Sequence, residues 1–99
     1  MNARQIFLLE FLLKQHEYLS ANQLAEKYGV STKTVYQDID KLNDFFDEGE
    51  LKSRIVKVPR KGIKLSADEE RKQIHSLLLV NKHESGVQDF SPEYRESEL

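Results

Sequence analysis

The sequence contains no cysteine, which excludes a disulfide framework and any metal site built from thiolates. It also lacks a long hydrophobic run. The longest one near the start, Ile6 to Leu9, is followed by Glu10 and has no cleavage signature, so it fits neither a signal peptide nor a membrane span. We therefore expect a cytoplasmic protein that does not have a membrane as a partner.

Catalytic and metal-binding patterns are missing as well. His75 and His83 lie on one expected helix without a cysteine or a paired carboxylate at ligand spacing, and His16 lies far from both in the sequence. The chain has no Ser/His/Asp or Cys/His set and no glycine-rich phosphate loop. The sequence therefore predicts no catalytic residue, no metal and no cofactor, and it does not indicate an enzyme.

Acidic and basic residues are unevenly distributed along the chain. The 99 residues carry a net charge of −2, yet residues 1 to 65 contain 11 Lys and Arg against 9 Asp and Glu, whereas residues 66 to 99 contain 4 against 8. Between Leu51 and Leu65, six basic residues occur without one acidic residue: Lys52, Arg54, Lys57, Arg60, Lys61 and Lys64. A local basic footprint of this kind is typical of contact with a nucleic acid.

The segment from Leu24 to Ile39 has the anatomy of a helix-turn-helix that reads DNA. Ala25 is small enough for two helices to cross closely, and Gly29 can take the positive φ that ends a first helix without a Cβ clash. Ser31 can then start a second helix as its N-cap. The apolar residues placed to form a shared core are Leu24, Val30, Val35 and Ile39.

Three helices are expected in the first half of the chain. Apolar spacing predicts the first over Ala3 to His16, and a capping box of Ser20 and Gln23 begins the second, over Ala21 to Tyr28. The third is expected from Thr32 to about Phe46. Its inner face consists of Val35, Ile39, Leu42 and Phe46. The residues that point outward or sideways are Lys33, Tyr36, Gln37 and Asp40.

Beyond Glu50 the apolar spacing changes from the helical period to a period of two. The alternating residues 55–58 and 63–65 flank Pro59-Arg60-Lys61-Gly62 and predict a β-hairpin with its tip at this turn. A last helix is expected from Ala67 to about His83, with acidic residues in its first turn that suit the helix dipole. Residues 84–99 are rich in Ser, Gly, Pro and acidic residues and are interpreted as a linker or mobile tail.

The order of these elements predicts a mainly α-helical fold with a small β-hairpin, the winged helix-turn-helix. Its three-helix core and wing would occupy residues 1–66, the C-terminal helix residues 67–83 and the tail residues 84–99. A chain of this length makes one small domain that buries about two thirds of the surface its unfolded chain exposes. Any core must therefore draw on most of the apolar residues.

Two motifs resemble the N-terminal winged helix-turn-helix of bacterial sugar-operon regulators. They are V-S-T-K-T-V-Y-Q-D-I-D-K-L from Val30 to Leu42 and P-R-K-G-I-K-L from Pro59 to Leu65. The closest resemblance is to BglG/MtlR/LicR-type activators with phosphotransferase-system regulation domains. DeoR-type repressors, Mga-type regulators and the DNA-binding domain of biotin ligase are relatives. The resemblance covers about residues 4–66.

The resemblance implies that the third helix enters the major groove, that the wing lies along the DNA backbone, and that further domains of the parent chain follow. The family commonly has R-T-[IV]-x-R-D-[IL] in the recognition helix and P-G-K-G-Y-x-L in the wing. In this chain Lys33 and Gln37 occupy the two arginine positions, Arg60 the first wing glycine and Ile63 the wing tyrosine. These departures leave the fold intact and bear on base preference and on the conformation of the wing tip.

Candidate DNA contacts lie at the start of the third helix and along the wing. The helix offers donors and acceptors for base edges and phosphates from Ser31, Thr32, Lys33, Thr34, Tyr36 and Gln37. Gln37 could pair with an adenine edge, and Lys33 with guanine acceptors or a phosphate. The wing offers cations for phosphates from Lys57, Arg60, Lys61 and Lys64. Asp38 and Asp40 would repel DNA, so we expect them to point sideways and to pair with Lys41 or with a basic residue of the wing.

These observations predict sequence-specific binding of double-stranded DNA by the head of a bacterial transcriptional regulator of a sugar-uptake or metabolic operon. Two alternatives stay open. The first is a winged helix used for protein–protein assembly, in which the polar residues of the third helix are merely solvated and apolar surface at Tyr36 meets the partner. The second is the DNA-binding head of a bifunctional enzyme such as a biotin ligase.

Surplus apolar surface on the first helix predicts one more contact. Phe7, Leu8, Phe11 and Leu12 cannot all face the core around the recognition helix. The last helix has an apolar stripe of its own, formed by Ile74, Leu77 and Leu78. We expect the two sets to meet within one chain, and the chain to dimerise weakly or not at all. Between two chains the same contact would instead make a homodimer with recognition helices about 34 Å apart.

Overall fold

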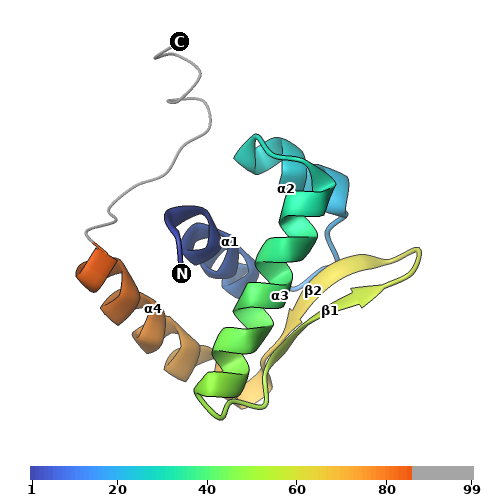
Figure 1. Cartoon of the computed structure of the whole chain (residues 1–99). Helices are drawn as coiled ribbons and strands as arrows, with labels where there is room; N and C mark the ends of the chain where they lie inside the picture. Colours follow the sequence, from blue (N-terminus) through green and yellow to red (C-terminus); the bar gives the residue numbers. More distant parts are fainter. Residues whose placement is uncertain (86–99) are drawn as a thin grey trace.

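The computed structural model describes residues 1–85, which form helices packed around a common core with a two-stranded antiparallel hairpin extending from one side (Figure 1). The elements are α1 (Ala3–Lys14), α2 (Ala21–Tyr28), α3 (Thr32–Glu48), β1 (Arg54–Val58), β2 (Gly62–Ser66) and α4 (Arg71–Ser85). Three helices followed by a hairpin and a last helix confirm the winged helix-turn-helix. None of the helices in this range is long and apolar enough to cross a membrane.

The caps predicted for the helix-turn-helix are present. Ser20 Oγ accepts from the backbone N–H of Gln23 at 3.0 Å, and the Gln23 side chain accepts in return from the Ser20 N–H at 2.8 Å. Gly29 ends α2 in the left-handed conformation, with φ of 65°. Ser31 Oγ then accepts from the N–H of Thr34 at 3.2 Å and starts α3. These local signals fix the turn between the two helices.

The wing is joined to α3 at its base. In the hairpin Ile55 lies opposite Leu65 and Val58 opposite Gly62, so residues 59–61 form the tip. The side chain of Asn43 on α3 accepts from the Ile55 N–H at 2.8 Å and donates to the Ile55 carbonyl at 3.2 Å. Both backbone groups at this free edge of β1 are therefore satisfied by one amide. The wing is held in a fixed place beside the recognition helix.

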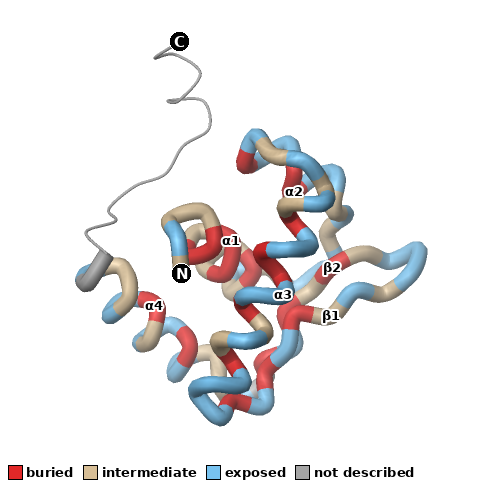
Figure 2. Tube along the Cα trace, viewed as in Figure 1, coloured by how far each residue is buried: buried red, intermediate tan, exposed pale blue. Residues whose placement is uncertain are grey.

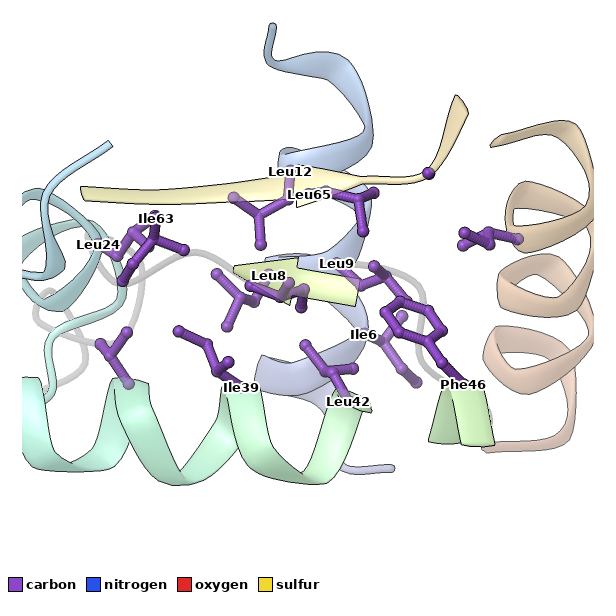
Figure 3. Close-up of a cluster of buried hydrophobic side chains, with 14 of the residues drawn as sticks. Ile6, Leu8, Leu9, Leu12, Leu24, Ile39, Leu42, Phe46, Ile63 and Leu65 are labelled. Atoms are coloured by element: carbon purple, nitrogen blue, oxygen red, sulfur yellow. The ribbon is translucent and has the colours of Figure 1, made fainter. Parts of the chain in front are cut away.

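The core lies between α1, α2, α3 and the inner face of the hairpin. Figure 3 shows side chains of these elements pointing toward one another, and the labelled ones are Ile6, Leu8, Leu9, Leu12, Leu24, Ile39, Leu42, Phe46, Ile63 and Leu65. Each of them is at most 2% exposed. Buried and exposed residues alternate along α3 with the helical period, so its outer side stays open to solvent (Figure 2). One side of α3 is therefore buried in the core, and the opposite side faces solvent.

The last helix packs against α1 within the same chain, as predicted. Ile74 and Leu78 are buried in the common core, and Leu77 packs against it. Lys82 Nζ lies 2.8 Å from the carboxylate of Glu10 and 4.9 Å from the ring centre of Phe7. The predicted set of α1 residues was only partly right, because Phe11 lies toward α2, with its ring centre 4.4 Å from Lys27 Nζ.

The first helix ends two residues before the predicted end at His16. Gln15 is already extended, with ψ of 142°. The early end leaves the Leu13 carbonyl without its helical partner, and Arg71 Nη1 donates to it at 2.5 Å. The chain has to leave the helix here because Leu19 pairs with the edge of β2.

The last helix begins later than the predicted Ala67. Ala67 precedes a 3-10 turn over Asp68–Glu70, and α4 starts at Arg71. The turn places the Glu70 carboxylate where it accepts from the N–H groups of Lys52 at 3.0 Å and Ser53 at 2.7 Å. These contacts lower the pKa of Glu70, first through the hydrogen bond from Lys52. The Glu70 carboxylate therefore makes a tertiary contact with the loop before β1.

Two helices run slightly further than predicted. α3 continues past Phe46 to Glu48 and is followed by Gly49, whose N–H donates to the Phe45 carbonyl at 3.1 Å. α4 continues past His83 to Ser85, so residues 84 and 85 of the predicted tail are helical. Residues 86–99 of that tail lie outside the described residues.

Candidate nucleic-acid interface

The exposed face of α3 carries the side chains best placed to meet bases. Lys33, Tyr36 and Gln37 are exposed near the N-terminus of the helix, whereas Thr32 and Thr34 are half-buried. Within residues 1–85, the side chains of Lys33 and Gln37 make no hydrogen bond or ion pair. Their donors and acceptors are therefore free for base edges and phosphates.

Two of the predicted contact residues are partly committed to the helix itself. Ser31 Oγ caps α3 and lies 3.1 Å from Thr34 Oγ1, within hydrogen-bond distance. This pair stabilises the first turn, which presents Lys33 to the surface. Ser31 and Thr34 thus prepare the helix for contact, and Lys33 and Gln37 carry the free polar groups.

Asp38 does not pair with Lys41 or with the wing, so that expectation was wrong. It is 3% exposed and points toward α1, where its Oδ1 accepts from Arg4 Nη2 and from Gln5 Nε2, each at 3.1 Å. The hydrogen bond to Asp38 raises the pKa of Arg4 above its ordinary value. No local pattern indicated this pairing, because the partners are more than 30 positions apart. These hydrogen bonds fix the orientation of α3 relative to α1. They also keep the charge of Asp38 away from the exposed face of α3.

Asp40 pairs with a basic residue of the wing, as expected. Its Oδ1 lies 3.9 Å from Lys57 Nζ, and the same nitrogen lies 5.2 Å from the ring centre of Tyr36. Lys57 stands opposite Ile63 in the hairpin, on the face that looks toward the core and α3. This cation therefore bridges the wing and the recognition helix.

A groove of about 600 Å³ separates the wing from the two helices of the helix-turn-helix. It is lined by Ser20 and Ala21 at the start of α2, by Tyr36 on α3, and by residues 57–63 of the wing. Lys57, Arg60 and Lys61 contribute cations, and none of the lining residues is acidic. The shape and the positive charge of this groove suit the phosphate backbone of a DNA strand.

The wing tip has an unusual backbone. Arg60 is left-handed, with φ of 68°, and Gly62 has φ of 114°. A Cβ at Gly62 would lie 2.5 Å from the Leu19 carbonyl oxygen, so only glycine fits at this position. Lys61 closes the turn by donating its N–H to the Val58 carbonyl at 3.0 Å. The tip thus projects Arg60 and Lys61 at the mouth of the groove.

The structure divides the four predicted wing cations between two faces. Lys57, Arg60 and Lys61 lie at the groove, whereas Lys64 stands opposite Val56 on the other face of the hairpin. Tyr18 was missed in the sequence analysis, and it joins this second face through Leu19, which pairs with Ile63. The sequence signal was weak, because only one residue of the connection 15–20 pairs with the hairpin, which is too short to show an alternating pattern.

Comparison with known proteins agrees with this arrangement. A family model described as an HTH domain matches residues 4–64, which span α1, the helix-turn-helix and the hairpin as far as β2. The chain matches no curated protein and no solved structure. Within residues 1–85 no group of His, Asp or Glu side chains could hold a metal ion. Because the match covers more than half of the chain, this protein belongs to the helix-turn-helix domain family, and its helix-turn-helix is a DNA-binding element.

Proposed function

We propose that this chain is the sequence-specific head of a bacterial transcriptional regulator, with α3 in the major groove of double-stranded DNA and the wing along the backbone. The observation that carries the proposal is the exposed pair Lys33 and Gln37, free of partners among residues 1–85, on a capped helix beside a groove with basic walls. Bidentate side chains such as Gln discriminate between bases, whereas cations beside the groove hold the backbone.

The positions of two acidic residues near this surface support the proposal. Asp38 is buried against Arg4 and Gln5, and Asp40 lies beside Lys57. Both of these carboxylates therefore have a cation beside them. The net charge of the chain is negative, but the surface around the groove is basic.

Binding to selected and unselected duplexes tests the proposal. A duplex is first enriched from a randomised library with the wild-type chain, and its affinity is compared with that of a random-sequence duplex. We expect Lys33→Ala and Gln37→Ala to weaken binding to the enriched duplex by about 1–3 kcal/mol each and to affect the random duplex much less. Lys72→Ala, on the exposed side of α4, is the control and should change neither affinity.

Two other results of these binding measurements would change or contradict the proposal. An equal loss on both duplexes would assign Lys33 and Gln37 to the backbone rather than to bases. A wild-type chain that enriches no sequence, and that instead self-associates or binds a protein with little dependence on salt, would contradict DNA recognition.

The kind of regulator is a further part of the proposal. The motif from Val30 to Leu42 and the wing motif from Pro59 to Leu65 resemble those of BglG/MtlR/LicR-type activators. We infer that the parent regulator controls a sugar-uptake or metabolic operon. A coding sequence that continues beyond Leu99 into a phosphotransferase-system regulation domain would support this, and one that continues into a biotin-ligase domain would contradict it.

A further inference from the structure

The segment between α1 and α2 pairs with the edge of the wing through one isolated β-bridge. The backbone of Leu19 exchanges two hydrogen bonds with Ile63, its N–H donating at 2.9 Å and its carbonyl accepting at 2.7 Å. Figure 1 shows this connection passing alongside β2. The close approach depends on Gly62, which has no Cβ to meet the Leu19 carbonyl. The residue before Leu19 is consequently fixed against the hairpin.

This residue is Tyr18, and alternation along a strand places it on the outer face of the wing. Leu19 and Ile63 share the inner face, so Tyr18 lies on the face of Lys64. The ring centre of Tyr18 lies 5.5 Å from Lys64 Nζ and 5.8 Å from Lys61 Nζ. These three residues form the outer wing cluster.

The charges of the outer wing cluster are uncompensated. Among residues 1–85 no carboxylate forms an ion pair with Lys61 or Lys64, in contrast to Lys57, which has Asp40 beside it. The Tyr18 side chain is 37% exposed, and its hydroxyl makes no hydrogen bond to the described residues. The cluster therefore offers two cations and a free hydroxyl donor, the groups that proteins use for phosphate oxygens.

The outer wing cluster is continuous with the proposed DNA surface. Lys61 belongs to both, because it lines the groove on one side and lies over the Tyr18 ring on the other. Ser20 and Ala21, which follow Tyr18 in the chain by two and three positions, also line the groove. The basic surface thus continues around the wing tip from one face of the hairpin to the other.

We propose that the outer wing cluster is a second binding site for the DNA backbone, in which Tyr18 and Lys64 contact phosphates distinct from those in the groove. The inference rests on the proposed function and adds Tyr18 to its contact residues. The ring holds the two ammonium groups in place before DNA arrives, which reduces the entropy lost when they meet phosphates. Both faces of the wing would then contact phosphates of the DNA backbone.

Salt-dependent binding tests this assignment. Kd is measured by fluorescence anisotropy on the random-sequence duplex and on the enriched duplex. Lys64→Gln removes one phosphate contact, so the slope of log Kd against log salt should fall by about 0.9 on both duplexes. Between about 50 and 200 mM salt, the wild-type Kd then rises about 3.5-fold more than that of the variant. Lys72→Gln on α4 is the matched control and should leave the slope unchanged.

A second variant separates contact from stabilisation of the wing. Tyr18→Phe keeps the ring under both lysines and removes only the hydroxyl, so we expect a loss of affinity of about two- to tenfold with an unchanged salt slope. The thermal midpoint of the variant should equal that of the wild type, because the hydroxyl has no partner within the described residues. A methylphosphonate scan of the enriched duplex should find a position that affects the wild type but not Lys64→Gln.

The results that overturn the inference differ from those that overturn the function. If Lys64→Gln and Tyr18→Phe bind as the wild type does while Arg60→Ala lowers the salt slope, the cluster only stabilises the hairpin. If the wild-type chain binds neither duplex, the proposed function itself is wrong.

Discussion

Arg60 at the wing tip has a backbone conformation that lowers stability and a charge that can contact DNA. Arg60 holds φ of 68°, a conformation that costs a residue other than glycine about 1–2 kcal/mol. It occupies the position where the resembling regulators have the first wing glycine. The chain therefore keeps a strained arginine beside the groove, where its charge can meet a phosphate.

Replacing Arg60 with glycine should leave the free energy of unfolding unchanged or raise it, and should weaken DNA binding. Arg60→Gly removes the left-handed strain but increases the freedom of the unfolded chain, so we expect stability between unchanged and about 1 kcal/mol higher. The salt slope of binding to a random duplex should fall by about 0.9. Urea unfolding and anisotropy measure the two effects.

Arg60→Ala is the matched variant, because it loses the charge but keeps the Cβ. It should show the same reduced salt slope without the gain in stability. A salt slope for Arg60→Gly equal to that of the wild type would remove the wing tip from the DNA interface.

At the scale of elements, one carboxylate connects the 3-10 turn to the loop that leads into the wing. Glu70 accepts from the N–H groups of Lys52 and Ser53 and from the Ser53 hydroxyl. These hydrogen bonds favour the charged form and lower the pKa of Glu70 below its ordinary value of 4.5. The loop before β1 is therefore held by an interaction that is stronger while this group is ionised.

A pH dependence of stability follows from this contact. Because the pKa is depressed in the folded state, the stabilisation is fully present above the unfolded pKa and is lost as pH falls through the folded pKa. Glu70→Gln should lower the thermal midpoint at about pH 7, and the difference from the wild type should shrink as pH falls below about 4. Glu69→Gln, which removes an exposed neighbouring carboxyl, is the control. A difference that stays constant across this range would show that ionisation of Glu70 does not stabilise the loop.

The elements that the sequence predicted best are those with local causes. Ser20, Gly29 and Ser31 act within one turn of the chain, and each was found in its predicted role. Helix ends set by distant partners were missed. α1 ends early because Leu19 pairs with β2, and α4 starts late because Glu70 turns toward the loop before β1. The candidate site follows the same division, since the exposed face of α3 obeys helical periodicity while the positions of Asp38 and Tyr18 depend on tertiary contacts.

At the scale of the whole molecule, α4 decides how much of the chain folds as one unit. It buries Ile74 and Leu78 in the core shared by α1 and α3. It is also tied to α1 by the ion pair between Lys82 and Glu10 and by the hydrogen bond from Arg71 to the Leu13 carbonyl. We therefore expect α4 to unfold with the winged helix-turn-helix in a single transition.

Two neighbouring leucines on α4 distinguish this internal role from assembly. Leu78 is 1% exposed and Leu79 is 52% exposed. Leu78→Asp places a charge in the core and should cost at least about 3 kcal/mol of unfolding free energy, whereas Leu79→Asp should change it by no more than about 0.5 kcal/mol. Urea denaturation measures both, and sedimentation at micromolar concentration should show a monomer for the wild type and for Leu79→Asp. A wild-type dimer that Leu79→Asp converts to a folded monomer would instead make the outer side of α4 an interface between two chains. The recognition helices would then be arranged as a pair by the chain itself.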